Sequence, residues 1–181
     1  MSDWRRNNSQ SVFECPIFKV RRDQYSSAKR GCDHEFFIIE PANWINIIAI
    51  TAAGEVVMVK QYRFGRESYT LEIPGGVIDE GESAEAAARR ELLEETGYQA
   101  ENWQWLGSSD PDSAIMNNRC DTFLAWPAVL NDEQNLDNLE EIEVQIMPLS
   151  QVPEMIATGK ISHALVIAAF YYHDLYQRKE K

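Results

Sequence analysis

One uninterrupted helical segment lies in the middle of a chain whose other segments mostly favour strands. Residues 83–96 hold good helix formers and neither Gly nor Pro, Ser83 can cap the N-terminus, and Gly97 can adopt the positive φ of a helix C-terminus. The segments that favour strands are 12–20, 35–40, 45–51, 56–62, 69–73, 103–108, 122–129 and 141–148, and closing helices are expected at 151–158 and 162–176. Strands on both sides of one central helix predict an α+β domain with αβα layers.

The charges of this helix are unfavourable for a helix in isolation. Glu91, Glu94 and Glu95 fall at i, i+3 and i+4, so their carboxylates share one face. Like charges at i, i+4 cost about 0.2–0.5 kcal/mol, and acids in the last turn oppose the helix dipole by about 0.3–1 kcal/mol. Two interpretations follow: an exposed acidic face whose repulsion water screens, or a set of carboxylates that binds hard divalent cations such as Mg²⁺.

A longer pattern around the helix favours the second interpretation. From Gly76 to Tyr98 the chain reads GVIDEGESAEAAARRELLEETGY. This segment resembles the Nudix box, and the matching residues are Gly76, Glu82, Arg90, Glu91, Leu92, Glu94, Glu95 and Gly97. The one departure is Tyr98, where the family prefers an aliphatic residue. The resemblance implies a Nudix hydrolase, which has a mixed-sheet αβα sandwich and cuts a pyrophosphate bond with the help of divalent metal ions.

The same resemblance implies roles for single residues of the box. The expected metal ligands are Glu91 and Glu95 as the main ligands, Glu94 and Glu82 for a second or third ion, and Gly75 through its backbone carbonyl. Arg90 is expected to orient the glutamates. Mg²⁺ is the expected cofactor, and Mn²⁺ can substitute for it. Residues 72–95 hold eight acids and two arginines, so a pyrophosphate needs cations in order to bind there.

Segments outside the box indicate the substrate class. The segments 60–63, 71–76 and 117–121, together with a β extension before Trp44, resemble the branch of ADP-ribose and nucleoside diphosphate sugar pyrophosphatases. The expected reaction splits an ADP-ribose-like or GDP-mannose-like substrate into a nucleoside monophosphate and a sugar phosphate. The alternatives are dinucleoside polyphosphates or nucleoside triphosphates as substrates and, in another class, a nucleotide-sensing module without catalysis.

Further residues are candidates for substrate binding and for the general base. The substrate-binding candidates are Arg63, Gln61, Arg119 and Trp44. An arginine can bind phosphate or a terminal sugar and the tryptophan can stack on a base, while surface ion pairs and packing are the structural alternatives. By the resemblance, a glutamate on a loop after the box activates water. Glu140 is the first choice and Glu141 the second, and a box glutamate such as Glu94 is a further option.

Residues 1–42 are expected to form a β extension, here called the arm, ahead of a catalytic domain of residues 43–181. Residues 1–30 hold seven basic and three acidic side chains, a charge of +4. Because the net charge of the chain is −12, the remaining residues carry −16. The arm is either a solvated basic segment or a surface that docks on an acidic partner. The resemblance favours the second possibility, with a second copy of the chain as the partner in a homodimer.

Composition narrows the other possible partners. The net charge of −12 disfavours nucleic acid. No apolar run approaches the ~20 residues of a membrane-spanning helix, so no membrane partner is expected. The three cysteines, Cys15, Cys32 and Cys120, match no zinc or disulfide spacing, and a cytoplasmic location is therefore expected.

Overall fold

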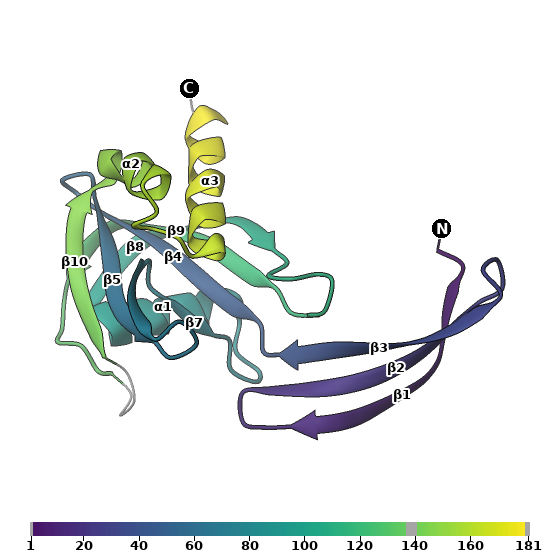
Figure 1. The fold of residues 1–181 in the computed structure, drawn as a ribbon. Coiled ribbons are helices and arrows are strands. Elements are labelled where there is room, and N and C mark those ends of the chain that lie inside the picture. The colour runs from purple at the N-terminus through teal and green to yellow at the C-terminus, as the bar shows by residue number, and fades with distance from the viewer. Residues whose placement is uncertain (1, 137–140, 180–181) are drawn as a thin grey trace. The chain divides into compact units, whose positions relative to one another are not determined.

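The computed structural model describes residues 2–136 and 141–179 (Figure 1). Contacts between Cα atoms divide the chain into two compact units. The first unit comprises Met1–Asn43 and Asp110–Arg119, and the second comprises Trp44–Ser109 and Cys120–Lys181. The segment 110–119 thus groups with the N-terminal residues, which no local pattern of the sequence indicated.

The first unit contains a three-stranded antiparallel sheet in the order β1-β2-β3. Its strands are β1 (Trp4–Glu14), β2 (Phe18–Ser27) and β3 (Cys32–Pro41). The prediction of one continuous strand over 12–20 is wrong, because the N–H of Cys15 donates to the carbonyl of Phe18 at 3.0 Å and closes a turn. Pro16 lies inside that turn and has no N–H for a strand ladder, which favours the break.

One face of this sheet holds a buried carboxylate. Asp23 is fully buried, accepts hydrogen bonds from the Ser9 hydroxyl at 2.6 Å and from Arg21 Nε at 3.0 Å, and lies 3.5 Å from Arg6 Nη1. Burial opposes its charge, but these donors hold the pKa of Asp23 below its ordinary value. Arg21 also pairs with Glu40, so polar contacts join all three strands.

Residues 110–119 run beside β3 in the same unit. The N–H of Ile39 donates to the carbonyl of Ile115 at 2.8 Å, and the Asn117 amide donates to Glu40 at 2.8 Å. The Asn118 amide donates to the carbonyl of Ala42 at 3.0 Å. Backbone and side-chain hydrogen bonds therefore fasten this segment to the arm.

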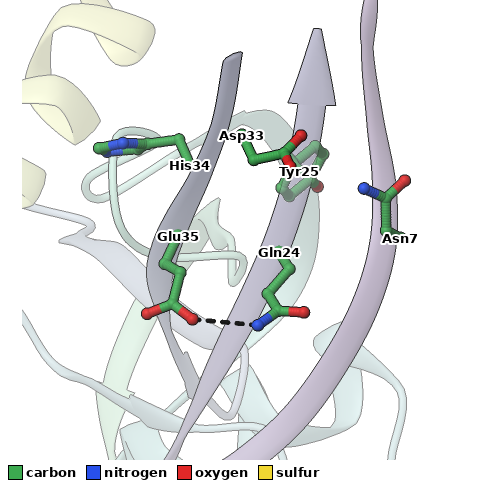
Figure 2. Close-up of a pocket in the computed structure, with 6 residues that line it drawn as sticks. All are labelled: Asn7, Gln24, Tyr25, Asp33, His34 and Glu35. Atoms are coloured by element: carbon green, nitrogen blue, oxygen red, sulfur yellow. Dashed lines mark hydrogen bonds between the residues drawn. The ribbon is translucent and has the colours of Figure 1, made fainter.

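The sheet of the arm also carries a polar depression (Figure 2). Inside it, the Gln24 amide donates to Glu35 at 3.1 Å. The other lining residues are Asn7, Tyr25, Asp33 and His34. Carboxylates and carboxamides dominate this lining, so the depression is a hydrophilic surface of the arm.

The second unit is built on a seven-stranded mixed sheet. The path is β10-β5-β4-β9-β8, with β6 paired to β5 and β7 paired to β4, and β4 runs parallel to β9. The strands are β4 (Trp44–Thr51), β5 (Glu55–Arg63), β6 (Ser68–Glu72), β7 (Gly75–Val77), β8 (Tyr98–Ser109), β9 (Cys120–Leu130) and β10 (Ile142–Pro148). The helices are α1 (Ala84–Thr96), α2 (Val152–Ala157) and α3 (Ala164–Lys179), with a 3₁₀ turn η1 at Leu149–Gln151. None of the helices in the described residues is long and apolar enough to cross a membrane.

Helices cover both faces of this sheet (Figure 1). The core on the α1 face contains Ala87, Ala88 and Leu92 of the helix with Ile45, Ile47 and Val57 of the sheet. The core on the α3 face contains Val166, Ala169 and Phe170 of the helix with Ile48, Val56 and Met58 of the sheet. Successive strand residues such as Ile47 and Ile48 point to opposite faces, so one sheet serves both cores. The expected α+β fold, an αβα sandwich with a mixed sheet, is confirmed.

Helix α1 begins and ends where its sequence signals lie. The Ser83 hydroxyl accepts a hydrogen bond from the N–H of Ala86 at 3.2 Å. Gly97 has a φ of 72°, and its N–H donates to the carbonyl of Leu93 at 2.8 Å. The last turn of α1 contains no basic residue, so acids rather than cations lie at the negative end of the helix dipole.

Candidate active site

Two carboxylates of α1 lie against the glycines of β7. The backbone N–H of Gly75 donates to Glu95 Oε2 at 2.9 Å, and Glu95 is only 3% exposed. A Cβ on Gly76 would overlap the carboxylate of Glu91, and a Cβ on Gly75 would overlap the backbone of β4. Only glycine therefore lets the strand approach the helix closely enough for the carboxylates to reach its backbone.

Arg90 gathers the remaining acids of the box. Its Nε and Nη2 donate to the two oxygens of Glu82 at 3.1 and 2.9 Å, and Nη2 also donates to the carbonyl of Val77 at 3.0 Å. Nη1 donates to Glu91 at 2.8 Å and to Glu94 at 3.1 Å. These five contacts match the five N–H donors of a guanidinium. They raise the pKa of Arg90, and the bond from Arg90 lowers the pKa of Glu82.

The chemistry of these side chains fits a hard divalent cation. Carboxylate and carbonyl oxygens are the ligands that such ions prefer. Glu91 and Glu95 are held by backbone and by Arg90 on the β7 side of α1, while Glu94 stays partly exposed. Within residues 2–136 and 141–179, no three Asp, Glu, His or Cys side chains already converge as a complete metal site. Glu82, Glu91 and Glu94 instead surround the guanidinium of Arg90.

A second arginine is fixed by a buried carboxylate. Arg63 Nε and Nη2 donate to the two oxygens of Glu72 at 2.9 and 2.7 Å, and the Thr70 hydroxyl donates to the same carboxylate at 2.6 Å. The Glu72 side chain is 4% exposed, whereas that of Arg63 is 44% exposed. Burial opposes the charge of Glu72, but Arg63 and Thr70 outweigh it and hold the pKa of Glu72 below its ordinary value.

Comparison with known proteins agrees with this arrangement. A family model described as NUDIX domain matches residues 42–170. The chain belongs to the NUDIX family. Its matched residues include the whole box from Gly76 to Tyr98, so α1 is the Nudix helix.

Curated relatives and a solved structure are similar to this chain over most of its length. An ADP-ribose pyrophosphatase of Bacillus subtilis (strain 168) is 30% identical over 139 residues, which cover 76% of this chain and 75% of that protein. An ADP-sugar pyrophosphatase of Mus musculus is 61% identical over 128 residues, covering 66% of this chain and 58% of that protein. The crystal structure of an ADP compounds hydrolase covers 99% of this chain and 97% of its own, with a TM-score of 0.88 at 21% identity, and supports the fold.

Family membership confirms the predicted reaction class. The chain is a Nudix pyrophosphohydrolase, and Nudix hydrolases in general use divalent metal ions. The roles of individual residues stay predictions.

The strand alternation brings two of the substrate-binding candidates to the face of the Nudix helix. Gln61 and Arg63 lie an even number of residues from Val57 on β5, so they share the face on which Val57 packs in the α1 core. By the same rule Trp44 shares the face of Ile48, which packs in the α3 core. Arg119 belongs to the first unit, where its Nε lies 3.6 Å from Asp110.

Of the two loop candidates for the general base, Glu140 is outside the described residues, and Glu141 directly precedes β10. Glu141 accepts a hydrogen bond from the Tyr69 hydroxyl at 2.5 Å. Tyr69 shares its face of the sheet with Leu71, which packs in the α3 core, so Glu141 is turned to the face opposite the Nudix helix.

Sequence reasoning did not single out Glu72, Thr70 or Tyr69. The sequence shows Glu72 as one of the eight acids of residues 72–95 and as part of segment 71–76, without a role of its own, although it is nearly as buried as any apolar core residue. The signal that could have found it is the hairpin register: β5 and β6 pair Arg63 with Ser68 and Val59 with Glu72. That register puts Glu72 on the same face as Arg63.

Proposed function

We propose that this Nudix hydrolase cleaves the diphosphate bond of nucleoside diphosphate sugars, with ADP-ribose and other ADP-sugars as first candidates. Water attacks one phosphorus, the bridging P–O bond breaks, and a nucleoside monophosphate and a sugar phosphate leave. The observation that carries the proposal is an arginine, Arg63, fixed on the same face of the sheet as the acids of the Nudix helix. A diphosphate needs both a cationic side chain and carboxylates that hold cations.

The names of relatives support this substrate class. The relatives from Bacillus subtilis and Mus musculus are named ADP-ribose pyrophosphatase and ADP-sugar pyrophosphatase. A relative from Mycobacterium tuberculosis, 28% identical over 171 residues, is also named ADP-ribose pyrophosphatase. We therefore rank ADP-sugars above dinucleoside polyphosphates and nucleoside triphosphates.

The proposed cofactor is Mg²⁺, with Mn²⁺ as a substitute. The residues proposed to hold it are Glu91, Glu95 and the carbonyl of Gly75, with Glu94 and Glu82 for further ions. Bound divalent ions supply positive charge that offsets the diphosphate and the charge developing on the leaving phosphate. Arg90 holds the carboxylates around itself and so keeps the acids of the helix and of its N-terminal loop in one place.

Side chains of the chain are proposed to bind the substrate and to accept the proton of the attacking water. Arg63 binds a phosphate oxygen, and the Gln61 amide lies on the same face for a further contact. Arg119 and Trp44 are proposed to contact the sugar and the base. We keep Glu140 as the first choice of general base and Glu94 as the alternative from the box. Glu141 is less suitable, because its carboxylate is bound to Tyr69 on the other face.

We further propose a cytoplasmic homodimer. The cysteines Cys15, Cys32 and Cys120 are all free thiols, which suits a reducing compartment. The proposed domains are the arm, residues 1–42, and the catalytic domain, residues 43–181. Residues 1–30 of the arm carry +4, whereas the remaining residues of the chain carry −16. In the proposed dimer the arm of one subunit packs on the other subunit and helps to bind its substrate.

A substrate panel tests the proposed reaction. Purified protein is incubated with ADP-ribose, other ADP-sugars, GDP-mannose, a dinucleoside polyphosphate and a nucleoside triphosphate, each with Mg²⁺, and products are separated by ion-exchange chromatography. We expect AMP and ribose 5-phosphate from ADP-ribose, at a higher kcat/KM than any triphosphate gives. Faster release of pyrophosphate from the triphosphate would contradict the proposal.

A further inference from the structure

The segment between β6 and β7 is fastened at three points within four residues. At its start, Glu72 holds the guanidinium of Arg63 through two hydrogen bonds. In its middle, the carbonyl of Pro74 accepts from the N–H of Ile47 on β4 at 2.8 Å. At its end, the N–H of Gly75 donates to Glu95 of the Nudix helix. One short stretch of backbone thus connects the fixed arginine to a carboxylate of the helix.

We propose that Glu72 is a positioning residue for substrate binding: it fixes Arg63 at a set place relative to the acids of the Nudix helix, so that one diphosphate can contact both. The inference rests on the proposed function, since it requires that Arg63 binds a phosphate oxygen. The Glu72 side chain is only 4% exposed, so in this proposal it does not touch the substrate and acts on it through Arg63.

The energetic reason lies in the flexibility of an arginine at the end of a strand. Arg63 is the last residue of β5, directly before the turn at 64–67. An arginine that is free to move loses rotamer entropy when it binds a ligand, which weakens binding. The two bonds to Glu72 order the guanidinium during folding, so that this loss is not repeated at substrate binding. Because the side chain stays 44% exposed, a ligand can reach it.

The carboxylate must be charged for this task, and its surroundings keep it charged. Burial of Glu72 favours the neutral acid, but the donors Arg63 and Thr70 hold its pKa below the ordinary value. A carboxamide in its place has one oxygen and one NH₂, and the NH₂ would face an N–H of the guanidinium. Glu72→Gln therefore releases one side of the fork with nearly the same side-chain shape.

A double-mutant cycle tests the proposal with the full-length protein, Mg²⁺ and ADP-ribose. Glu72→Gln should raise KM about tenfold, the size of one charge-assisted hydrogen bond, and should change kcat less than about threefold. Arg63→Ala should raise KM by at least as much. In the double variant KM should equal that of Arg63→Ala within about twofold, because Glu72 then has nothing to position.

Two further variants serve as controls. Glu143→Gln removes a carboxylate that pairs with Lys60 at 2.9 Å on the other face of β5, and it should leave KM unchanged. Thr70→Val removes only the hydroxyl that supports Glu72, and it should raise KM slightly while the protein stays folded. It tests the idea even if Glu72→Gln unfolds. Binding of Mn²⁺, followed by electron paramagnetic resonance, should be equal in all variants.

The outcomes separate this inference from the proposed function. A wild-type protein that hydrolyses no nucleoside diphosphate sugar contradicts the proposed function before any variant is made. An active wild type with unchanged KM in folded Glu72→Gln and Thr70→Val overturns the positioning role. So does a double variant whose KM is the product of the two single effects, since Glu72 would then act independently of Arg63.

Discussion

Gly76 shows how one missing side chain sets the spacing between β7 and the Nudix helix. In Gly76→Ala the new Cβ overlaps the Glu91 carboxylate, and either the strand or the glutamate must move. We expect kcat to fall about 100-fold, the size of effect that a displacement of about 1 Å has on catalysis. Gly65→Ala is the matched control, because nothing lies within 4 Å of its Cβ. Steady-state rates with ADP-ribose measure both, and equal rates would contradict a close role for Glu91.

Glu95 is the most buried acid of the Nudix helix. In Glu95→Gln the amide oxygen can still accept the N–H of Gly75, so the fold should survive. The lost charge should lower kcat at least ~100-fold, as expected when a bound ion that offsets transition-state charge is lost or misplaced. Glu85→Gln, on the exposed first turn of the same helix, should keep its rate. A Glu95→Gln enzyme with most of its activity would favour the acidic-surface interpretation.

The buried pair of Glu72 and Arg63 also makes stability depend on pH. The pKa of Glu72 in the folded protein lies below the ordinary value of 4.5, so the charged carboxylate stabilises the fold above that pH. This stabilisation is lost as the pH falls through the folded pKa. Wild type should therefore melt at a higher temperature than Glu72→Gln at about pH 7, and the difference should shrink below about pH 4. Calorimetry across this range measures it, and a difference independent of pH would contradict the assignment.

At the level of elements, local signals predicted the Nudix helix well. The expected helix over 83–96 agrees with α1 to within one residue, because a cap, a glycine and strong helix formers all act locally. The arm was predicted less well: three strands form where two were expected, since the turn at Cys15 and Pro16 interrupts an apolar stretch. The segment 110–119 joins the arm through pairing with Ile39, which no local pattern reveals.

The candidate site also contains residues that local spacing predicts and residues that depend on strand pairing. The acids of the box follow from spacing alone, since residues three and four apart on a helix share a face. The partner of Arg63 depends on the register of β5 against β6, which brings Glu72 back from nine residues later. The direction of Glu141 depends on which face Tyr69 occupies, and this too is set by pairing between strands. Residues placed by strand register are therefore those that the sequence left undecided.

The crowding of acids on α1 predicts that divalent ions stabilise the protein. Glu91 and Glu94 already share one arginine, and the last turn has no cation of its own. Mg²⁺ should therefore stabilise the folded protein, by about 2.7 kcal/mol at 100 times its Kd, and so raise Tm. A chelator should abolish activity. Thermal unfolding with Mg²⁺ and with EDTA measures the shift. Glu95→Gln should reduce the shift and Glu85→Gln should not, whereas full turnover in excess EDTA would contradict a metal requirement.

For the whole molecule, the exposed apolar side chains and the charge of the arm favour binding to a second copy of the chain. The arm leaves large apolar side chains in water, including Phe13 at 53%, Ile17 at 75% and Phe37 at 54% exposure. Nearly all of β1 is exposed as well. Exposed apolar side chains favour burial against another surface, and open strand edges invite pairing with another chain. The +4 charge of residues 1–30 against −16 elsewhere favours docking on another copy.

The last prediction is therefore a homodimer that depends on the arm. Light scattering at micromolar concentration should give twice the mass of the chain for the full-length protein. Deleting residues 1–40 should give a monomer or an unstable protein, because Ile115 and Asn117 lose their partners, and should weaken substrate binding more than Mn²⁺ binding. Phe13→Asp is the milder variant and should shift the mass towards the monomer. Phe64→Asp, at a phenylalanine that is even more exposed but lies in the second unit, should not. A full-length chain that is monomeric and fully active would show that the arm serves its own subunit.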